Sequence, residues 1–146
     1  MNTHETYVSL ETAKLLKEEE FDWECNAHYK QNGDFIFRGY DHDWNAAASV
    51  KPNVEYYSAP TLSVAQRWLR EVKGIEITID WCIVVDGKIV DFNERCYSYH
   101  VESGHFADGS MFKFKTYEEA LEAGIQKCLE LKTKITFSNP HCEHDE

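Results

Sequence analysis

The chain has little positive charge and no long apolar segment. Its 15 Lys and Arg stand against 26 Asp and Glu, so the formal net charge is −11 at pH 7. Nucleic-acid binding depends on Lys and Arg neutralising phosphates, and this balance argues against a nucleic-acid-binding protein. No apolar run approaches the roughly 20 residues that a membrane-spanning helix needs. We expect neither a nucleic acid nor a membrane as partner.

The cysteines lack any pattern that marks a disulfide framework or a metal site. The five are odd in number, widely spaced and without a C-x-x-C pair. The start, MNTHETYVSL, has neither the basic nor the apolar region of a secretory signal peptide. We therefore expect reduced thiols in a cytoplasmic protein. A domain of this size buries about 68–70% of its unfolded surface, so its core needs no covalent staple.

Sequence signatures of catalysis are also missing. The chain contains no G-x-S-x-G nucleophile turn and no glycine-rich loop for a phosphate. Cys82 and Cys96 fall in predicted strands, where a cysteine is more often a small buried apolar residue than a reactive thiolate. These absences predict a protein without a cofactor and favour binding over catalysis, with an enzymatic activity left open.

One motif is present three times: a Ser or Thr, an apolar residue, and an Ala four residues after the hydroxyl. The copies begin at Ser9, Thr61 and Thr116. A hydroxyl at this position accepts a hydrogen bond from a first-turn amide, so each copy predicts the start of an amphipathic helix. A recurrence at about fifty residues predicts a repeated supersecondary unit.

The first repeat contains the signals of a helix followed by three strands. Residues 23–30 alternate between apolar and polar side chains, which predicts a half-buried strand with His28 on its polar side. Asn32-Gly33 is the preferred pair for a tight hairpin turn, and residues 35–40 return as the second strand. An irregular connection over 41–53 leads to a third strand at 54–57.

The second repeat has stronger signals. Its helix is expected to end at Gly74, and an alternating strand runs from Glu76 into Asp86-Gly87, another hairpin turn. Residues 111–115 supply a third strand. The turn predicts one apolar sheet face that meets the helices, with four facing pairs: Val85 with Lys88, Ile83 with Val90, Trp81 with Phe92, and Ile77 with Cys96.

These elements predict a single α+β domain over residues 1–146. We expect a two-layer fold in which an antiparallel sheet of about six strands carries three helices on one face. The order is αβββ-αβββ-α. The pseudo-repeat units cover 9–60 and 61–115, a closing helix covers 116–132, and the acidic tail over 138–146 is expected to fray.

Three segments, in this order and at these spacings, carry a resemblance: YVSLETAKLLKE, SAPTLSVAQRWLREV and TYEEALEAGIQKCLEL. They resemble a family of small uncharacterised proteins of gut anaerobic bacteria and their phages or prophages, over the three helices and most of the chain. Such relatives often carry Gly before the Phe-Asp that ends the first helix, where this chain has Glu20. The resemblance implies a small cytoplasmic accessory protein of mobile-element origin, and it implies no activity, cofactor or catalytic residue.

Two loops in equivalent positions of the units hold the candidate ligand-binding residues. Carboxylates and imidazoles can gather around a cation or act as acid and base, provided a cleft holds them together. If the repeat is real, both loops lie at one end of the sheet and form one polar cluster. The alternative is a pair of ordinary solvated loops. The residues are Asp41, His42, Asp43, Trp44, His100, Glu102, His105 and Asp108.

Two further groups have an open interpretation. The tail carries His141, Cys142 and His144, but a structural zinc site needs four ligands fixed by a fold, so a solvated tail is the expected reading. Several aromatic residues lie in or beside strands and are either core or interface residues, because Tyr and Trp are enriched at protein interfaces. These are Trp44, Tyr56, Tyr57, Tyr97 and Tyr99.

The leading hypothesis is a non-enzymatic accessory or protein-interaction domain that binds a protein partner or forms a homodimer. It depends on the missing catalytic motifs, the acidity and the aromatic content, which is 14%. The first alternative is a small-ligand or metal-binding module that uses the 41–44 and 100–108 loops. The second is an acidic polyanion mimic that binds a basic host protein.

Overall fold

The structure, a computed structural model, describes the backbone of residues 6–49 and 54–138 and the side chains of residues 6–46 and 54–131. It contains three α-helices, α1 (Leu10–Glu18), α2 (Leu62–Lys73) and α3 (Tyr117–Ser138). Among the described residues, no helix combines the length and hydropathy that crossing a bilayer requires. The fold is α+β, as the sequence predicts.

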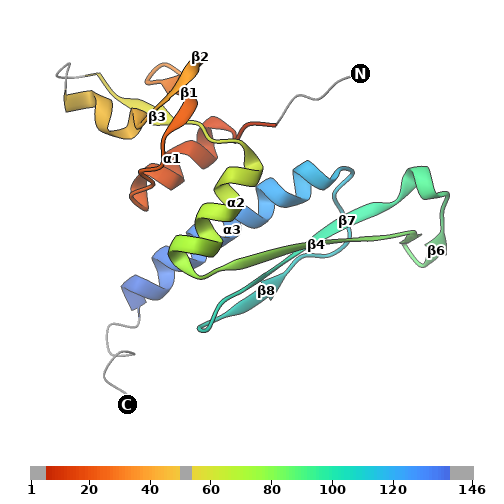
Figure 1. The fold of residues 1–146 in the computed structure, drawn as a ribbon. Coiled ribbons are helices and arrows are strands. Elements are labelled where there is room, and N and C mark those ends of the chain that lie inside the picture. The colour runs from red at the N-terminus through yellow and green to blue at the C-terminus, as the bar shows by residue number, and fades with distance from the viewer. Residues whose placement is uncertain (1–5, 50–53, 139–146) are drawn as a thin grey trace.

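The strands form separate small sheets, with the helices between the two larger ones (Figure 1). β1 (Cys25–Lys30), β2 (Phe35–His42) and β3 (Tyr56–Ser58) form an antiparallel sheet in the order β2-β1-β3. α1 contacts β3 of this sheet. A 3-10 helix, η1 (Trp44–Ser49), lies between β2 and β3.

The second sheet contains β4 (Glu76–Cys82), β7 (Cys96–Glu102) and β8 (Ala107–Gly109) in that order. α2 contacts β4, and α3 contacts both β4 and β7. Between β4 and β7 the chain forms an arm, residues 83–95, with a two-stranded ribbon and a 3-10 turn. The arm elements are β5 (Val84–Val85), β6 (Lys88–Ile89) and η2 (Phe92–Glu94).

The structure does not confirm one sheet of about six strands, nor the repeated unit. The described strands fall into two three-stranded sheets and the two-stranded ribbon. In the first sheet the first strand in sequence is central, whereas the second sheet is a meander with β7 in its centre. Two units with different strand order are not copies of one arrangement, so the repeat is limited to the helix starts.

The predicted register is confirmed from the Asp86-Gly87 turn to Ile83 and Val90, where the Val90 amide donates to Ile83 O at 2.7 Å, and it is wrong beyond that pair. Both turn residues have positive φ, 54° and 77°, as a type I′ turn requires. Val85 faces Lys88 as predicted. The ribbon then gives way to η2, so Ile77 faces Val101 rather than Cys96. The Asp86-Gly87 turn joins only β5 and β6. It does not set the register between the long strands β4 and β7.

All three helix starts are confirmed. At Ser9, Thr61 and Thr116 the hydroxyl oxygen accepts a hydrogen bond from the amide three residues on, at 3.2, 3.3 and 3.0 Å. The alanine of each motif has 0% exposed surface, so the small side chain lies where the helix packs most closely. The closing helix continues to Ser138, past its predicted end at residue 132.

α3 approaches the second sheet most closely at Gly124. A Cβ atom at this position would lie 3.2 Å from both Ile77 Cγ2 and Tyr99 Cβ. Such contacts are tighter than normal packing, so the helix reaches this distance only because residue 124 has no side chain. The core between helices and sheets includes the largest fully buried side chains: Trp68, Phe21, Leu16, Leu69, Ile75 and Ile125.

The end of α1 stores backbone strain at Glu20. This residue follows the helix in the left-handed region, with φ 67°, where glycine has no steric penalty and other residues do. The amide of the next residue, Phe21, donates back to Leu16 O at 3.0 Å, which closes the helix end. The backbone at this position therefore favours glycine.

We predict that Glu20→Gly stabilises the protein by about 1 kcal/mol, because it removes the left-handed strain of a residue with a Cβ atom. Urea unfolding followed by circular dichroism measures the change. Glu18→Gly, inside the last turn of α1, is the matched control and is expected to destabilise by about 0.5–1 kcal/mol. Destabilisation by both substitutions contradicts the strain at Glu20.

Candidate functional site

The first candidate loop is built around a buried tryptophan. Asp41 and His42 are exposed at the end of β2, and Asp43 is half-buried. Trp44 opens η1 and is only 6% exposed. Its indole Nε1 donates to Cys25 O at 2.7 Å, which fixes η1 over the outer face of the first sheet. Trp44 is thus a packing residue.

Beneath Trp44 lies His28, which the alternating pattern had placed on the polar side of its strand. The imidazole is 0% exposed and packs against Trp44 and Tyr56, with ring centroids 4.4 and 4.8 Å away. Neither ring nitrogen has a hydrogen-bond partner among the described residues. Burial, with the nearby charges of Arg38 and Lys30, lowers the pKa of His28 to about 4. The ring is therefore neutral at pH 7.

We predict that His28 makes the fold acid-sensitive. Because its pKa is lowered in the folded state, the unfolded chain binds a proton between about pH 6.5 and 4 that the folded protein does not. This removes up to about 3 kcal/mol of the free energy of unfolding as the pH falls through that window. His28→Leu is expected to lose this pH-dependent part, measured by urea unfolding at pH 7, 5.5 and 4.

The exposed His105 provides the matched control. His105→Leu is expected to leave the fall in stability between pH 7 and 4 as it is in the unsubstituted protein. If the buried and the exposed substitution give the same pH dependence, His28 is not the acid-sensitive group.

The second candidate loop presents polar groups that bond locally. His100 Nε2 lies 3.3 Å from Glu102 Oε1 on β7. Asp108 on β8 forms an ion pair with Lys127 of α3 at 3.5 Å. His105 is exposed, and its amide donates to the Ser103 hydroxyl at 3.0 Å. These contacts order the β7–β8 connection and leave no shared cavity.

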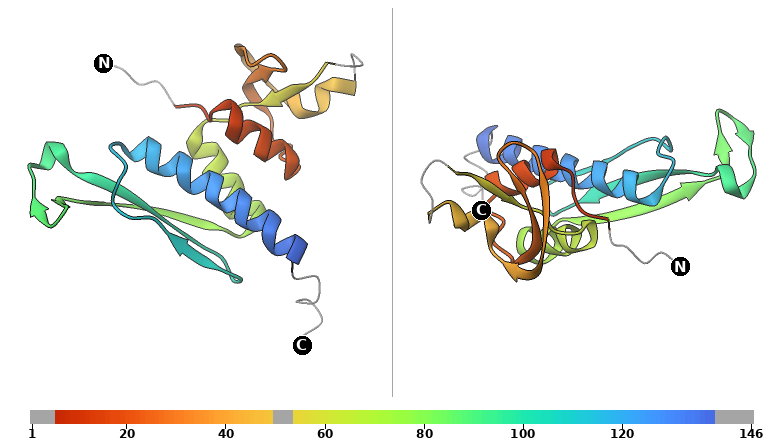
Figure 2. Two further views of the ribbon diagram at one scale, coloured as in Figure 1. Left: turned by 180° about the vertical axis from the view of Figure 1, so that it is seen from behind. Right: turned by 90° about the horizontal axis from the view of Figure 1, so that it is seen from above.

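The two loops do not form the polar cluster that the repeat predicts. They belong to different sheets, and the helices lie between these sheets, as Figure 1 and the left view of Figure 2 show. The part of the chain that the structure describes contains no group of three His, Cys, Asp or Glu arranged to hold a metal ion. His141, Cys142 and His144 lie outside the described residues.

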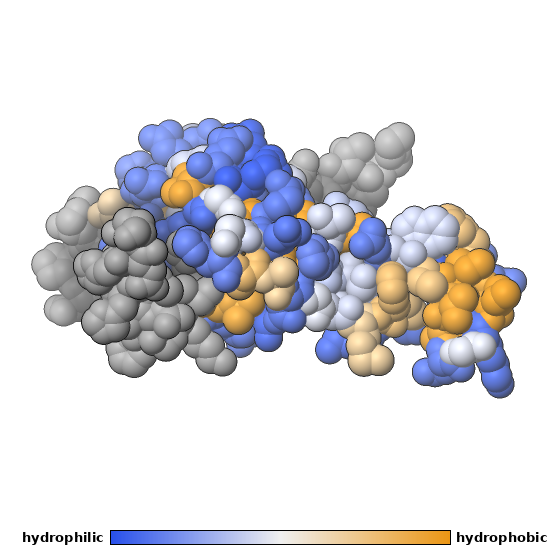
Figure 3. All heavy atoms as spheres, turned by 90° about the horizontal axis from the view of Figure 1, so that it is seen from below, coloured by the Kyte–Doolittle hydropathy of each residue, from blue (hydrophilic) through white to orange (hydrophobic). Residues whose placement is uncertain are grey.

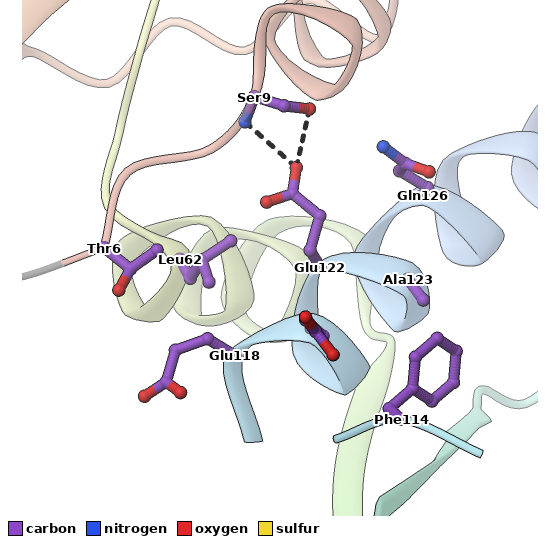
Figure 4. A pocket seen from close by; sticks show the side chains of 9 residues that line it. Thr6, Ser9, Leu62, Phe114, Glu118, Glu122, Ala123 and Gln126 are labelled. Carbon is purple, nitrogen blue, oxygen red and sulfur yellow. Dashed lines mark hydrogen bonds between the residues drawn. The ribbon is translucent and has the colours of Figure 1, made fainter. Parts of the chain in front are cut away.

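A cavity lies elsewhere, where the starts of the three helices meet (Figure 4). It has a volume of about 540 Å³. The walls are largely apolar with carboxylates at the rim. The cavity is lined by Thr6, Ser9, Leu62, Phe114, Glu118, Glu119, Glu122, Ala123 and Gln126.

One carboxylate of this cavity, Glu122, joins α3 to the start of α1. Its Oε2 accepts from Ser9 N at 3.0 Å, from Ser9 Oγ at 2.9 Å, and from the Thr12 hydroxyl. Gln126 Nε2 also donates to Thr12 Oγ1, at 2.8 Å. A negative charge at a helix N-terminus is stabilised by the free amides and the helix dipole. Glu122 therefore caps α1 from another helix.

We predict that Glu122→Ala destabilises the protein by about 1.5–3 kcal/mol, because it leaves the Ser9 amide and the buried Thr12 hydroxyl without their charged acceptor. Chemical unfolding measures this loss. The exposed neighbour Glu118 is the matched control, and Glu118→Ala is expected to change stability by less than about 0.5 kcal/mol. Equal effects of the two substitutions contradict the capping role.

Large apolar side chains gather on the arm and the adjoining end of β4 (Figure 3). We define the arm surface as Trp81, Val84, Ile89, Phe92 and Arg95. Trp81 is 51% exposed, Ile89 78% and Phe92 55%, and Val84 is also exposed. Since a large apolar side chain presents about 150–250 Å², the four apolar residues together expose roughly 400 Å². Patches of this size on a monomer are often functional.

Arg95 orders the arm surface. Its guanidinium stacks over the Phe92 ring with 3.9 Å to the centroid, donates from Nη1 to Phe92 O at 2.8 Å, and donates from Nε to Tyr97 OH at 2.8 Å. The Trp81 and Phe92 rings meet edge to face at 5.1 Å between centroids. Tyr97 in turn meets Tyr117 at 6.3 Å. A continuous aromatic row thus runs from the arm to the start of α3.

From the sequence, other aromatic residues were the candidates for an interface. Trp44 is buried, and Tyr56, Tyr57 and Tyr99 are half-buried against the core. Tyr97 is half-buried and contacts Arg95 of the arm surface. Trp81, expected on a face that meets the helices, is exposed because the sheet continues past the start of α3 (Figure 1). The sequence does contain a signal for an exposed apolar surface here. Trp81 alternates with polar residues, and its strand leads into a turn that has apolar residues on both sides.

No family model, no curated protein and no solved structure matches this chain. What the protein does must therefore be inferred from its own surfaces and cavities. Of the surfaces and cavities described above, the arm surface brings together the exposed apolar side chains of Trp81, Ile89 and Phe92.

Proposed function

We propose that the protein is a non-enzymatic interaction domain that binds another protein through the arm surface. The observation that carries this proposal is the exposure of Trp81, Ile89 and Phe92 together on an element that projects beyond the helices. Leaving such side chains in water forgoes the free energy of apolar burial, about 25 cal/mol per Å². A partner that covers them recovers it.

The composition of the arm surface supports binding to protein. Trp, Tyr and Arg are the residues that most often dominate protein–protein binding energy, above all when they lie together at the centre of a patch. Here Arg95 is already held between Phe92 and Tyr97, so little side-chain freedom is lost when a partner docks. The arm surface is therefore largely preorganised.

Charge selects the kind of partner. The chain carries a net charge of −11, so two copies repel one another while a basic protein is attracted over distances up to the Debye length, about 8–10 Å in physiological salt. We therefore assign the arm surface to a basic protein that offers an apolar pocket. This assignment combines the leading hypothesis with the acidity that suggested polyanion mimicry.

The small-ligand alternative has one supporting observation, the cavity of about 540 Å³ between the helix starts. Such volumes suit small molecules. Its carboxylate Glu122, however, already accepts several hydrogen bonds from Ser9 and Thr12. The remaining rim carboxylates Glu118 and Glu119 are exposed. The arm surface is the stronger candidate because Trp81, Ile89 and Phe92 are each more than half exposed.

We predict that Ile89→Lys lowers the affinity for the partner at least tenfold, because it places a charge within the apolar arm surface. Val72→Lys is the matched control: Val72 is an equally β-branched, exposed residue (52%), but it lies on α2. The three proteins are coupled to resin and exposed to a native lysate, and bound proteins are identified by mass spectrometry.

A basic protein recovered by the unsubstituted chain and by Val72→Lys, but not by Ile89→Lys, supports the proposal. Recovery that does not depend on Ile89 contradicts it. Sedimentation velocity of the purified chain tests the other occupant: a dimer that Ile89→Lys dissociates would make the partner a second copy and overturn the assignment to a basic protein.

A further inference from the structure

Two cysteines face each other at the point where the arm leaves the second sheet. Cys82 is the last residue of β4, Cys96 is the first residue of β7, and the two are register partners. Both are free thiols. A bond between them would join the two ends of the arm, residues 83–95.

The backbone places this pair within reach of a disulfide. Tyr97 N donates to Phe114 O, and Tyr97 O accepts from Phe114 N, so the polar groups of Tyr97 point away from β4. The neighbouring Cys96 must then point its own amide and carbonyl toward β4, which makes Cys82 and Cys96 a hydrogen-bonded antiparallel pair. Such pairs have Cα atoms about 5.5 Å apart, and disulfides span about 4.4–6.8 Å.

Cys82 is more accessible than the other described cysteines. It is half-buried, and its Sγ accepts from Val84 N at 3.3 Å. Its register partner Cys96 is buried beneath it, at 3% exposed. Cys25 and Cys128 are also buried, and burial raises the pKa of each thiol to about 12. A peroxide from solvent therefore reaches Cys82 first.

We propose that Cys82 and Cys96 form an oxidisable dithiol that hydrogen peroxide converts to a disulfide across the base of the arm. The Cys82 thiolate attacks one peroxide oxygen, the O–O bond breaks, and water leaves behind a sulfenic acid. The Cys96 thiolate then attacks the Cys82 sulfur, the S–S bond forms, the S–O bond breaks, and a second water leaves. Two thiols lose two electrons and one peroxide is reduced to two waters.

The disulfide fixes the two strands beside Trp81 and Tyr97, which are themselves register partners one residue further into the sheet. The proposal does not depend on whether the arm surface binds a protein, because disulfide formation is measured on the purified chain alone.

The test uses the full chain with Cys142→Ser, because Cys142 lies outside the described residues and its thiol complicates the mapping. The folded protein is treated with a small excess of hydrogen peroxide, free thiols are alkylated, and the chain is unfolded, alkylated with a second label and digested without reductant. We expect most of the protein to contain a peptide pair linked through Cys82 and Cys96. Cys25 and Cys128 are expected to carry the second label.

Two variants make the result specific. Cys25→Ser is expected to keep the Cys82–Cys96 bond, whereas Cys96→Ser is expected to stop at a sulfenic acid on Cys82 that a dimedone probe captures. Circular dichroism before treatment shows that each variant is folded. Alkylation of both Cys82 and Cys96 after peroxide treatment, or linkage of either one to Cys25 or Cys128, would overturn the proposal.

Discussion

The contact between α3 and the second sheet decides which part of that sheet is core and which is surface. Gly124 lets the helix lie directly on Ile77 and Tyr99, where the strands are buried. The helix begins only at Tyr117, beside Tyr97, so the sheet beyond this level has no covering layer. Trp81 and the arm are apolar by sequence and exposed by this geometry. The proposed function depends on this exposure, which arises because α3 begins only at Tyr117.

A second contact holds the two halves of the fold together. The Glu122 carboxylate of α3 accepts from the first residue before α1, so the helix that covers the first sheet is capped by the helix that covers the second. The hydroxyl caps and this carboxylate serve the same purpose. They satisfy helix ends that would otherwise lie unpaired where helices meet.

Local chemistry made part of the fold predictable from the sequence. The three hydroxyl caps and the Asp86-Gly87 turn follow from neighbouring residues, and the structure has all four. The pairing of Ile77 with Val101 was not predictable, because the pattern does not reveal that residues after the turn leave the ribbon. The same holds for the Glu122 cap, whose partners lie more than a hundred residues away.

The position of the candidate site was not predicted from the sequence. Sequence reasoning favoured aromatic residues at an interface, and it selected residues such as Trp44, which covers the buried His28. It also aligned two histidine-bearing loops as equivalent, and these end up in separate sheets. In both cases the deciding factor is tertiary: whether another element covers a strand face is not encoded in the alternation of that strand.

The most direct measurement of the central claim is site-specific photo-crosslinking from the arm surface. A photoreactive phenylalanine derivative at position 92, and separately at position 72 on α2, is irradiated in a native lysate. The account predicts one discrete adduct with a basic protein from position 92 and none from position 72. The same adducts from both positions, or no adduct from position 92, would contradict it.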